Sequence, residues 1–152
     1  MQPLRKSGLT LPPVLTLADL QRAYAAGVTP LEVVEAVLAR RAALADPAVF
    51  ITKTPDDDLR AQAREVMVRG AENLPLYGIP FAVKDNIDVA GLPTTAGCPA
   101  YAYDPAADSA VVARLRAAGA LVIGKTNLDQ FATGLNGTRS PYGALRSVFD
   151  AD

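Results

Sequence analysis

Residues 78–98 read GIPFAVKDNIDVAGLPTTAGC, and this stretch decides how the fold is interpreted. It opens with an apolar run over residues 79–83 that predicts a buried strand, and the run ends abruptly on Lys84. A dense polar cluster, residues 85–88, follows at once, and then a loop rich in Gly, Thr and Pro. In open α/β sheets, sites lie beyond the carboxyl ends of the strands. Lys84 is therefore a candidate site residue.

The residues alone leave two interpretations of Lys84 open. A lysine at the end of a strand ordinarily reaches into solvent. A lysine held in a partly apolar pocket instead loses the hydration of its ammonium form, which favours the neutral amine that can act as a base. The adjacent Asp85 opposes the second interpretation, because a close carboxylate favours the charged form. We expect Asp85 to oppose it less if its side chain turns away to cap backbone amides.

The absence of histidine from all 152 residues narrows the possible chemistry. It excludes Ser-His-Asp and Cys-His catalysis within this chain, together with every His-containing metal site. Cys98 is the only cysteine, so thiolate metal sites and internal disulfides are excluded as well, and a reducing cytoplasm is the expected compartment. Proton transfer within this chain must then use lysine, a carboxylate or tyrosine.

The composition is that of a globular protein, with half of the residues apolar and a fifth charged. Lys and Arg number 15 and Asp and Glu number 16, which gives a net charge of −1. No basic excess indicates binding to nucleic acid or to an anionic membrane. The apolar runs are too short to span a bilayer, and the first ten residues lack the apolar core of a signal peptide.

Hydrophobic periodicity and turn residues predict an α/β chain. Helices are expected over residues 16–27, 29–41, 56–70, 108–119 and 127–134, and strands over residues 48–53, 79–84 and 120–124. The two most apolar strands each lie beside a helix, which favours a sheet that is buried on both faces.

Capping residues sharpen the expected helix ends. Thr29 is expected to cap the second helix, with Glu32 as its capping-box partner, and Asn127 to cap the last, short helix. The helix over residues 108–119 is expected to bury one stripe of four side chains: Val111, Val112, Leu115 and Ala118.

Residues 119–126, GALVIGKT, formally match the phosphate-binding pattern G-x-x-x-x-G-K-T. The four variable positions are Ala-Leu-Val-Ile, which form a strand core, whereas the motif requires a flexible loop between a strand and a helix. A chance match is therefore favoured over a nucleotide site. Lys125 is expected to lie at a sheet edge or to cap an element, and not to serve as a second base.

Two long segments carry a resemblance to a known family. Residues 78–98, quoted above, and residues 118–134, AGALVIGKTNLDQFATG, resemble the amidase signature family in their order and in the helix that joins them. Residues 16–41 match the opening of the family loosely. The resemblance implies an α/β fold, the N-terminal portion of an amidase-signature fold, with a central mixed sheet covered by helices on both faces and incomplete in this chain.

The resemblance also implies how the chain is organised. Residues 1–152 are expected to be the N-terminal fragment of one amidase domain. Within it we expect a helical opening over about residues 16–45, a sheet-and-helix portion over about 49–134, and a loop tail over 135–152.

In this family the lysine of the "VKD" segment, here Lys84, takes a proton from a serine held on a cis peptide bond. That serine deprotonates a nucleophilic serine, which forms an acyl-enzyme that water hydrolyses. The resemblance thus implies that Lys84 is the catalytic base and that the site needs neither a metal nor a cofactor. It also implies that Phe131, Ala132, Thr133 and Gly134 line the substrate pocket, with plain core packing as the alternative for Phe131.

The two catalytic serines of the family belong to a Gly/Ser-rich segment that is absent from this sequence. The four serines present are Ser7, Ser109, Ser140 and Ser147. None has the Gly-rich flanks that would expose a nucleophile or supply an oxyanion hole. Ser109 is expected beside a helix N-cap and Ser140 in a turn. We therefore expect the 152-residue chain alone to be inactive.

Residues 94–98, TTAGC, and residues 129–150 most resemble the allophanate hydrolase branch of the family. The A subunits of amidotransferases normally continue differently after the corresponding segment. The resemblance implies hydrolysis of allophanate to ammonia and carbon dioxide in urea degradation. The expected partners are a small amide or urea-derived substrate, the remainder of the amidase domain and a second copy in a homodimer.

Two alternatives to an allophanate hydrolase stay open. One is another enzyme of the family, either a general amidase or the A-type chain of an amidotransferase. The other is a truncated, non-catalytic fragment that binds a partner through an open sheet edge.

Overall fold

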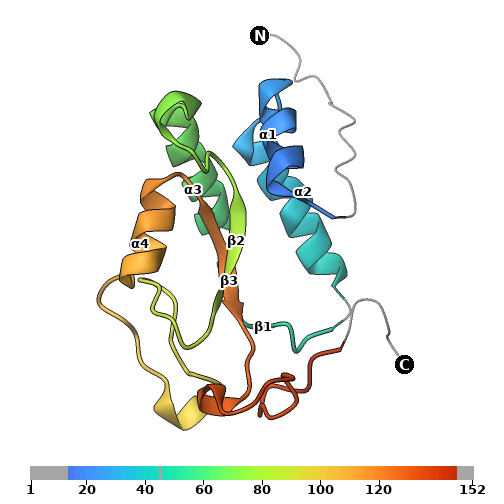
Figure 1. The fold of residues 1–152 in the computed structure, drawn as a ribbon, viewed down its shortest axis with the longest axis vertical. Coiled ribbons are helices and arrows are strands. Elements are labelled where there is room, and N and C mark those ends of the chain that lie inside the picture. The colour runs from blue at the N-terminus through green and yellow to red at the C-terminus, as the bar shows by residue number, and fades with distance from the viewer. Residues whose placement is uncertain (1–13, 45, 147–152) are drawn as a thin grey trace.

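The computed structural model describes residues 14–44 and 46–146 (Figure 1). Its helices are α1 (Leu17–Ala25), α2 (Pro30–Ala43), α3 (Asp56–Arg69) and α4 (Ala110–Ala117), and its strands are β1 (Phe50–Lys53), β2 (Pro80–Lys84) and β3 (Leu121–Thr126). Three 3-10 turns complete it: η1 (Ala71–Asn73), η2 (Pro99–Tyr101) and η3 (Gln130–Ala132). The first four predicted helices and all three predicted strands are therefore confirmed. Ser7, Ser147 and the end of the predicted tail lie outside the described residues.

The three strands form one mixed sheet in the order β1-β3-β2. β1 runs antiparallel to β3, whereas β2 runs parallel to β3 and places Lys84 opposite Thr126. Because β2 and β3 are parallel neighbours, their carboxyl ends meet at one end of the sheet, the lower end in Figure 1. The residues that follow these two strands gather there.

Successive side chains of β3 alternate between two cores. Leu121 packs among α2 and α3 on one face, and Val122 packs with Val112 of α4 on the other. Helices therefore cover both faces of a mixed sheet, as predicted. The predicted stripe on α4 is wrong at Val111, which is 52% exposed whereas Val112 is 1% exposed. Neighbouring residues on a helix point about 100° apart, so the buried face of α4 admits only one of these two valines.

The first two helices begin at complete capping boxes. The Thr16 hydroxyl accepts the N–H of Asp19 at the start of α1, and Thr29 does the same for Glu32 at the start of α2. In each box the acidic side chain, Asp19 or Glu32, accepts the backbone N–H of the threonine. Thr29 and Glu32 are thus confirmed in their predicted roles.

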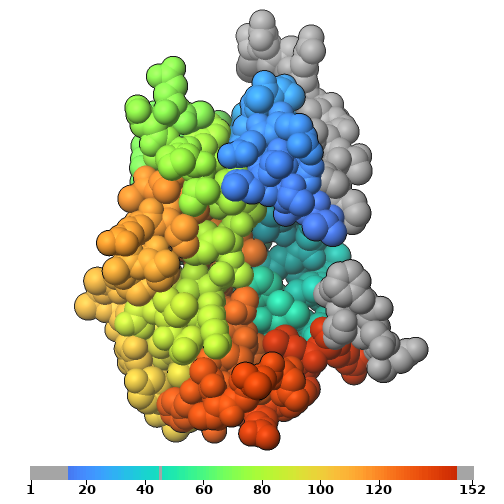
Figure 2. Space-filling model, viewed as in Figure 1, coloured from blue at the N-terminus to red at the C-terminus, as the bar shows by residue number. Residues whose placement is uncertain are grey.

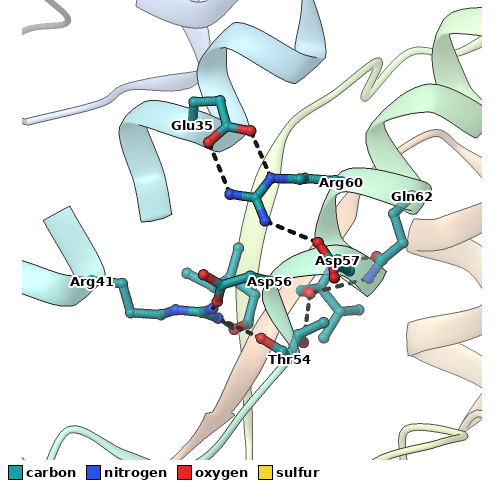
Figure 3. A network of polar contacts seen from close by, with 9 residues as sticks. Glu35, Arg41, Thr54, Asp56, Asp57, Arg60 and Gln62 are labelled. Carbon is teal, nitrogen blue, oxygen red and sulfur yellow. Dashed lines mark hydrogen bonds and ion pairs between the residues drawn. The ribbon is translucent and has the colours of Figure 1, made fainter. Parts of the chain in front are cut away.

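β1 pairs with β3 only at residues 124–126, so residues 122 and 123 of β3 have no strand partner on that side. Side chains of α2 and α3 form hydrogen bonds to the backbone there (Figure 3). The Gln62 side chain of α3 accepts the N–H of Val122 at 3.0 Å. Arg41 of α2 donates to the Ile123 carbonyl at 2.9 Å and also pairs with Asp56. Gln62 thus satisfies a buried backbone N–H that β1 does not reach, and Arg41 adds a second donor to the Ile123 carbonyl, which also accepts the N–H of Thr54. They fix α2 and α3 against the sheet.

Candidate active site

Lys84 is the last residue of β2, and its side chain is exposed among the described residues. Its carbonyl accepts the N–H of Ile87 at 2.9 Å, which starts the turn that ends the strand. The next residue, Asp85, still donates its N–H to Thr126 of β3 at 3.0 Å. The lysine therefore projects from the carboxyl end of the sheet, which is where the strand pattern predicts it.

Asp85 is fully buried and its carboxylate is engaged in the loop that follows β2. One oxygen accepts the backbone N–H of Thr95 at 3.0 Å and the hydroxyl of the same residue. The other lies 3.6 Å from the Lys125 amine. The expectation that Asp85 caps a backbone amide is confirmed, and the carboxylate is occupied by partners other than Lys84.

The prediction that Lys125 lies at a sheet edge is wrong, because β3 is the central strand and the Lys125 side chain is completely buried. Its amine donates to the Pro93 carbonyl and to the Thr94 hydroxyl, each at 3.0 Å. Burial lowers the pKa of Lys125 below its ordinary value, and the nearby Asp85 carboxylate opposes that shift. Lys125 thus joins the loop after β2 to the middle of the sheet.

The segment that matches the phosphate-binding pattern is β3 itself, since residues 121–126 are all extended. The motif requires a loop at the lysine, so the nucleotide-site alternative is wrong.

A tight turn over residues 95–98 carries the loop back toward the residues after β3. The Thr95 carbonyl accepts the N–H of Cys98 at 2.9 Å, and Ala96 and Gly97 both have positive φ, 52° and 71°. A Cβ atom on Gly97 would lie 3.2 Å from the Leu128 carbonyl oxygen, so glycine permits this close approach. The Ala96 carbonyl then accepts the N–H of Phe131 at 2.8 Å. One hydrogen bond therefore joins the two loops.

The predicted substrate segment, Phe131–Gly134, lies at the same end of the molecule as Lys84. Phe131 is 51% exposed and its ring packs edge-on against Tyr101, with centroids 5.4 Å apart. Core packing is thus the wrong interpretation of Phe131. Thr133 and Gly134 border a surface hollow of about 340 Å³. In Figure 2 the orange and red residues after β3 form the lower surface beside the yellow-green loop.

The helix predicted after β3 is replaced by the 3-10 turn Gln130–Ala132, and Asn127 does not cap it. The Asn127 side chain accepts the N–H of Leu128 and the hydroxyl of Ser140, and it donates to the Gly143 carbonyl at 3.0 Å. Asn127 therefore fastens the later loop to the end of β3. The Ser140 hydroxyl is engaged in that contact, and Tyr142 donates its N–H to it within a turn, as predicted for Ser140.

Asp129 is a buried acidic residue after β3 whose role the sequence interpretation missed. Its side chain is buried and accepts the backbone N–H groups of Asn136, Gly137 and Arg139. These bonds, that from Arg139 foremost, hold the pKa of Asp129 below its ordinary value. An aspartate followed by a run containing Gly and Asn is typical of such a loop, and it is the only signal that could have indicated this role.

Three further observations concern Ser109, metal ligands and membrane-spanning helices. Ser109 occupies the N-cap position of α4 itself, one residue from its predicted place, and its buried hydroxyl has no hydrogen-bond partner within the described residues. In that same part of the chain no group of three His, Cys, Asp or Glu residues could hold a metal ion. No helix in residues 14–44 and 46–146 is long and apolar enough to cross a membrane.

Comparison with known proteins adds independent information. Residues 32–152 match the family model described as Amidase. The chain is 68% identical over 81 residues, 53% of its length, to urea amidolyase of Saccharomyces cerevisiae. It is 39% identical over 146 residues, 91% of its length, to the A subunit of glutamyl-tRNA(Gln) amidotransferase from Symbiobacterium thermophilum. A solved structure of Kluyveromyces lactis allophanate hydrolase superimposes on 85% of the chain with a TM-score of 0.74 and 49% identity. The chain spans 4%, 30% and 22% of these three proteins, respectively.

Proposed function

Because the chain belongs to the amidase family, we propose that it supplies the catalytic base, Lys84, of an enzyme that hydrolyses allophanate. The observation that carries the proposal is the placement of Lys84 at the shared carboxyl end of β2 and β3, opposite Thr126, after which the chain continues into residues 131–134. The similarity to a urea amidolyase and to an allophanate hydrolase supports the choice of substrate.

In the proposed reaction the neutral amine of Lys84 takes a proton from a serine, which in turn deprotonates a second, nucleophilic serine. That serine attacks the amide carbonyl, ammonia leaves, and water hydrolyses the acyl-enzyme. The described serines do not suit these roles, because the Ser109 hydroxyl is buried at the start of α4 and the Ser140 hydroxyl bonds to Asn127. Both reacting serines would come from the remainder of the amidase domain, and no metal or cofactor takes part.

Lys84 is exposed in this chain, as expected for a lysine at the end of a strand, so an apolar pocket around its amine would have to come from the remainder of the amidase domain. A base must give up its ammonium proton near neutral pH, and a close carboxylate would oppose this. The nearest carboxylate in the sequence, Asp85, is buried and engaged with Thr95 and Lys125. The exposed Lys84 amine is free to meet the partners that the rest of the domain would bring.

A second candidate function is that of the A-type chain of an amidotransferase. The 39% identity to such a chain extends over 91% of the present sequence, a larger share than the stretch matched by the urea amidolyase. The two functions differ in the fate of the amide nitrogen, which a hydrolase releases and an amidotransferase passes to an acceptor, and glutamine serves as the second amide in the test. The proposal of an allophanate hydrolase also includes a cytoplasmic location and a homodimer.

Ammonia release by the complete amidase domain tests the proposal. We expect release from allophanate to exceed release from glutamine, and to be lost in Lys84→Ala. Lys53→Ala is the matched control, because Lys53 is also exposed at the end of a strand but lies in β1. Lys84-dependent release from glutamine alone would favour the amidotransferase. Full activity of Lys84→Ala would overturn the assignment of the base.

A further inference from the structure

We propose that Asp129 is a positioning residue that holds residues 130–139 in the shape that presents Phe131–Gly134 to the substrate. Its effect on catalysis rests on the proposed function. Its hold on the loop rests on the hydrogen bonds alone. Asp129 touches neither Lys84 nor, in this proposal, the substrate, so it acts only through the segment that it supports.

The carboxylate of Asp129 is the centre around which the loop folds. One oxygen accepts the N–H of Arg139 at 2.7 Å, and the other accepts the N–H groups of Asn136 and Gly137 at 3.2 and 3.0 Å. The Arg139 carbonyl also accepts the N–H of Gln130 at 2.9 Å, which closes the base of the loop. An ionised carboxylate accepts hydrogen bonds at both oxygens and donates none, so it matches three converging N–H groups.

Gly134, within the predicted substrate segment, lies directly against this carboxylate. A Cβ atom built on Gly134 would lie 2.2 Å from Oδ2 of Asp129 and 2.5 Å from its Cγ. No side chain fits at residue 134 while the carboxylate keeps its place. The substrate segment and Asp129 are thus in direct contact, and a change at either one displaces the other.

The backbone between these residues is held in an unusual conformation. Phe131 and Ala132 have φ of 51° and 57°, a region that residues with a Cβ atom rarely adopt unless their surroundings impose it. On one side the Phe131 N–H is bound to the Ala96 carbonyl at 2.8 Å. On the other side the Ala132 N–H is bound to the Asp129 carbonyl at 2.7 Å. Both bonds join main-chain atoms, so they hold Phe131 and Ala132 whatever the side chain at residue 129. The Asp129 carboxylate adds the bonds to residues 136–139, which hold the loop that continues from this segment.

The decisive variant is Asp129→Asn, which keeps the size of the side chain but replaces one acceptor oxygen by an NH₂ group. That group would face backbone N–H groups, so at least one of the three bonds must be lost. In the 152-residue chain we expect hydrogen exchange of the Asn136, Gly137 and Arg139 amides to accelerate by about tenfold or more, in line with a local opening. Asp104→Asn, an exposed aspartate in another loop, is the matched control and should leave these amides unchanged.

The same variant in the complete amidase domain tests the effect on the substrate. We expect kcat/KM for allophanate to fall by on the order of 10²-fold, as displaced positioning groups commonly cause. We also expect the ratio of kcat/KM for allophanate to that for acetamide to change by about tenfold, because a displaced pocket wall alters selectivity. A purely structural aspartate would lower stability and leave this ratio as it is.

Each outcome decides between these roles. Faster exchange with an unchanged selectivity ratio would overturn the positioning role, and unchanged exchange would overturn the hold on the loop. If the proposed function is wrong, Lys84→Ala keeps full activity. The hydrogen-exchange result for Asp129→Asn does not depend on that outcome.

A second pair of variants keeps the test valid if Asp129→Asn does not fold. Gly134→Ala should lower the thermal midpoint of the wild-type chain, because its methyl group meets the carboxylate. The same change in Asp129→Ala should cost little, because the space is then free. Equal costs of Gly134→Ala in the two backgrounds would contradict the contact on which the proposal depends.

Discussion

Lys84 ends β2 with an exposed side chain, and two substitutions at this residue distinguish a base from an anchor. In the complete amidase domain, Lys84→Ala should lower kcat/KM by roughly 10²–10⁴-fold, the usual contribution of a general base. Lys84→Arg should be nearly as inactive, because a guanidinium keeps its proton at every working pH. Steady-state kinetics and the thermal midpoint of both variants provide the measurement. Near-wild-type turnover of Lys84→Arg would mean that the residue is only a charged anchor.

Asp129 makes stability depend on pH in the acid range. Its folded-state pKa lies below its ordinary value of 3.8, because backbone N–H groups and the Arg139 charge favour the carboxylate. The stabilisation is therefore complete above about 3.8 and is lost as the pH falls through the lowered folded-state value. We expect the difference in thermal midpoint between the wild type and Asp129→Asn to shrink as the pH falls below about 3.8. A difference that stays constant over this range would exclude the carboxylate as its source.

Among single residues, the sequence predicted the two at the end of an apolar strand and missed two buried side chains that no such boundary marks. Lys84 and Asp85 could be identified because an apolar run ends at them, and Asp85 indeed binds a backbone amide. Lys125 and Asp129 could not, because Lys125 lies within the strand β3 and Asp129 within a segment whose pattern predicted a helix. The Pro93 carbonyl that Lys125 binds lies 32 residues away in the sequence, and no local pattern reports such a partner.

The elements follow the sequence wherever local signals and packing agree. The helices start near residues 16 and 29 as predicted, the second at the predicted capping box of Thr29, and the apolar runs become β2 and β3. The predicted helix after β3 failed because the side chains of Asn127 and Asp129 bind the following loop. Helix propensity is a weak preference, and tertiary hydrogen bonds override it over so short a segment.

Lys125 connects two elements, and its removal should show how firmly the loop after β2 is attached to β3. Lys125→Met leaves the buried Asp85 without its cation, and breaking such a pair typically costs about 3–5 kcal/mol. Lys53→Met, at an exposed position in β1, should change the free energy of unfolding by less than about 0.5 kcal/mol. Urea unfolding of the two variants makes the comparison. A Lys125→Met chain as stable as Lys53→Met would show that the loop is held by other contacts.

Adding Asp85→Asn to Lys125→Met provides a further check on the pair. The double variant no longer carries an unpaired buried charge, so it should cost less than the two single changes added together. Strict additivity would mean that the amine and the carboxylate, 3.6 Å apart, do not depend on each other.

For the whole molecule, we expect the purified 152-residue chain to release no ammonia from allophanate. The reason is chemical, since the proposed base has no serine partner among residues 14–44 and 46–146. A colorimetric ammonia assay is sufficient, with Lys84→Ala as the control for background release. Lys84-dependent ammonia release by this chain would show that a serine in it can react.

The overall architecture was accessible from the sequence because it depends on a few strong patterns. A parallel pair of apolar strands with a helical crossover needs only two runs and the helix between them, and both are evident in residues 78–126. The shape of the lower end in Figure 1 was not accessible. It is set by single contacts, such as Gly97 against the Leu128 carbonyl and Gly134 against Asp129.

The bond between Ala96 and Phe131 has a consequence for how the chain tolerates change. Thr94 and Tyr103 exchange two backbone hydrogen bonds, at 2.9 and 3.1 Å. These bonds hold the start of the segment that leads from the loop after β2 to α4. Ala106 and Ala107 are exposed later in this segment, and they take part in neither the Ala96–Phe131 bond nor the Thr94–Tyr103 pair. Insertions there would lengthen the outer surface without altering the spacing between Lys84 and Phe131. This stretch is where related chains can differ in length, and where a reporter group can be attached, at the least cost to the site.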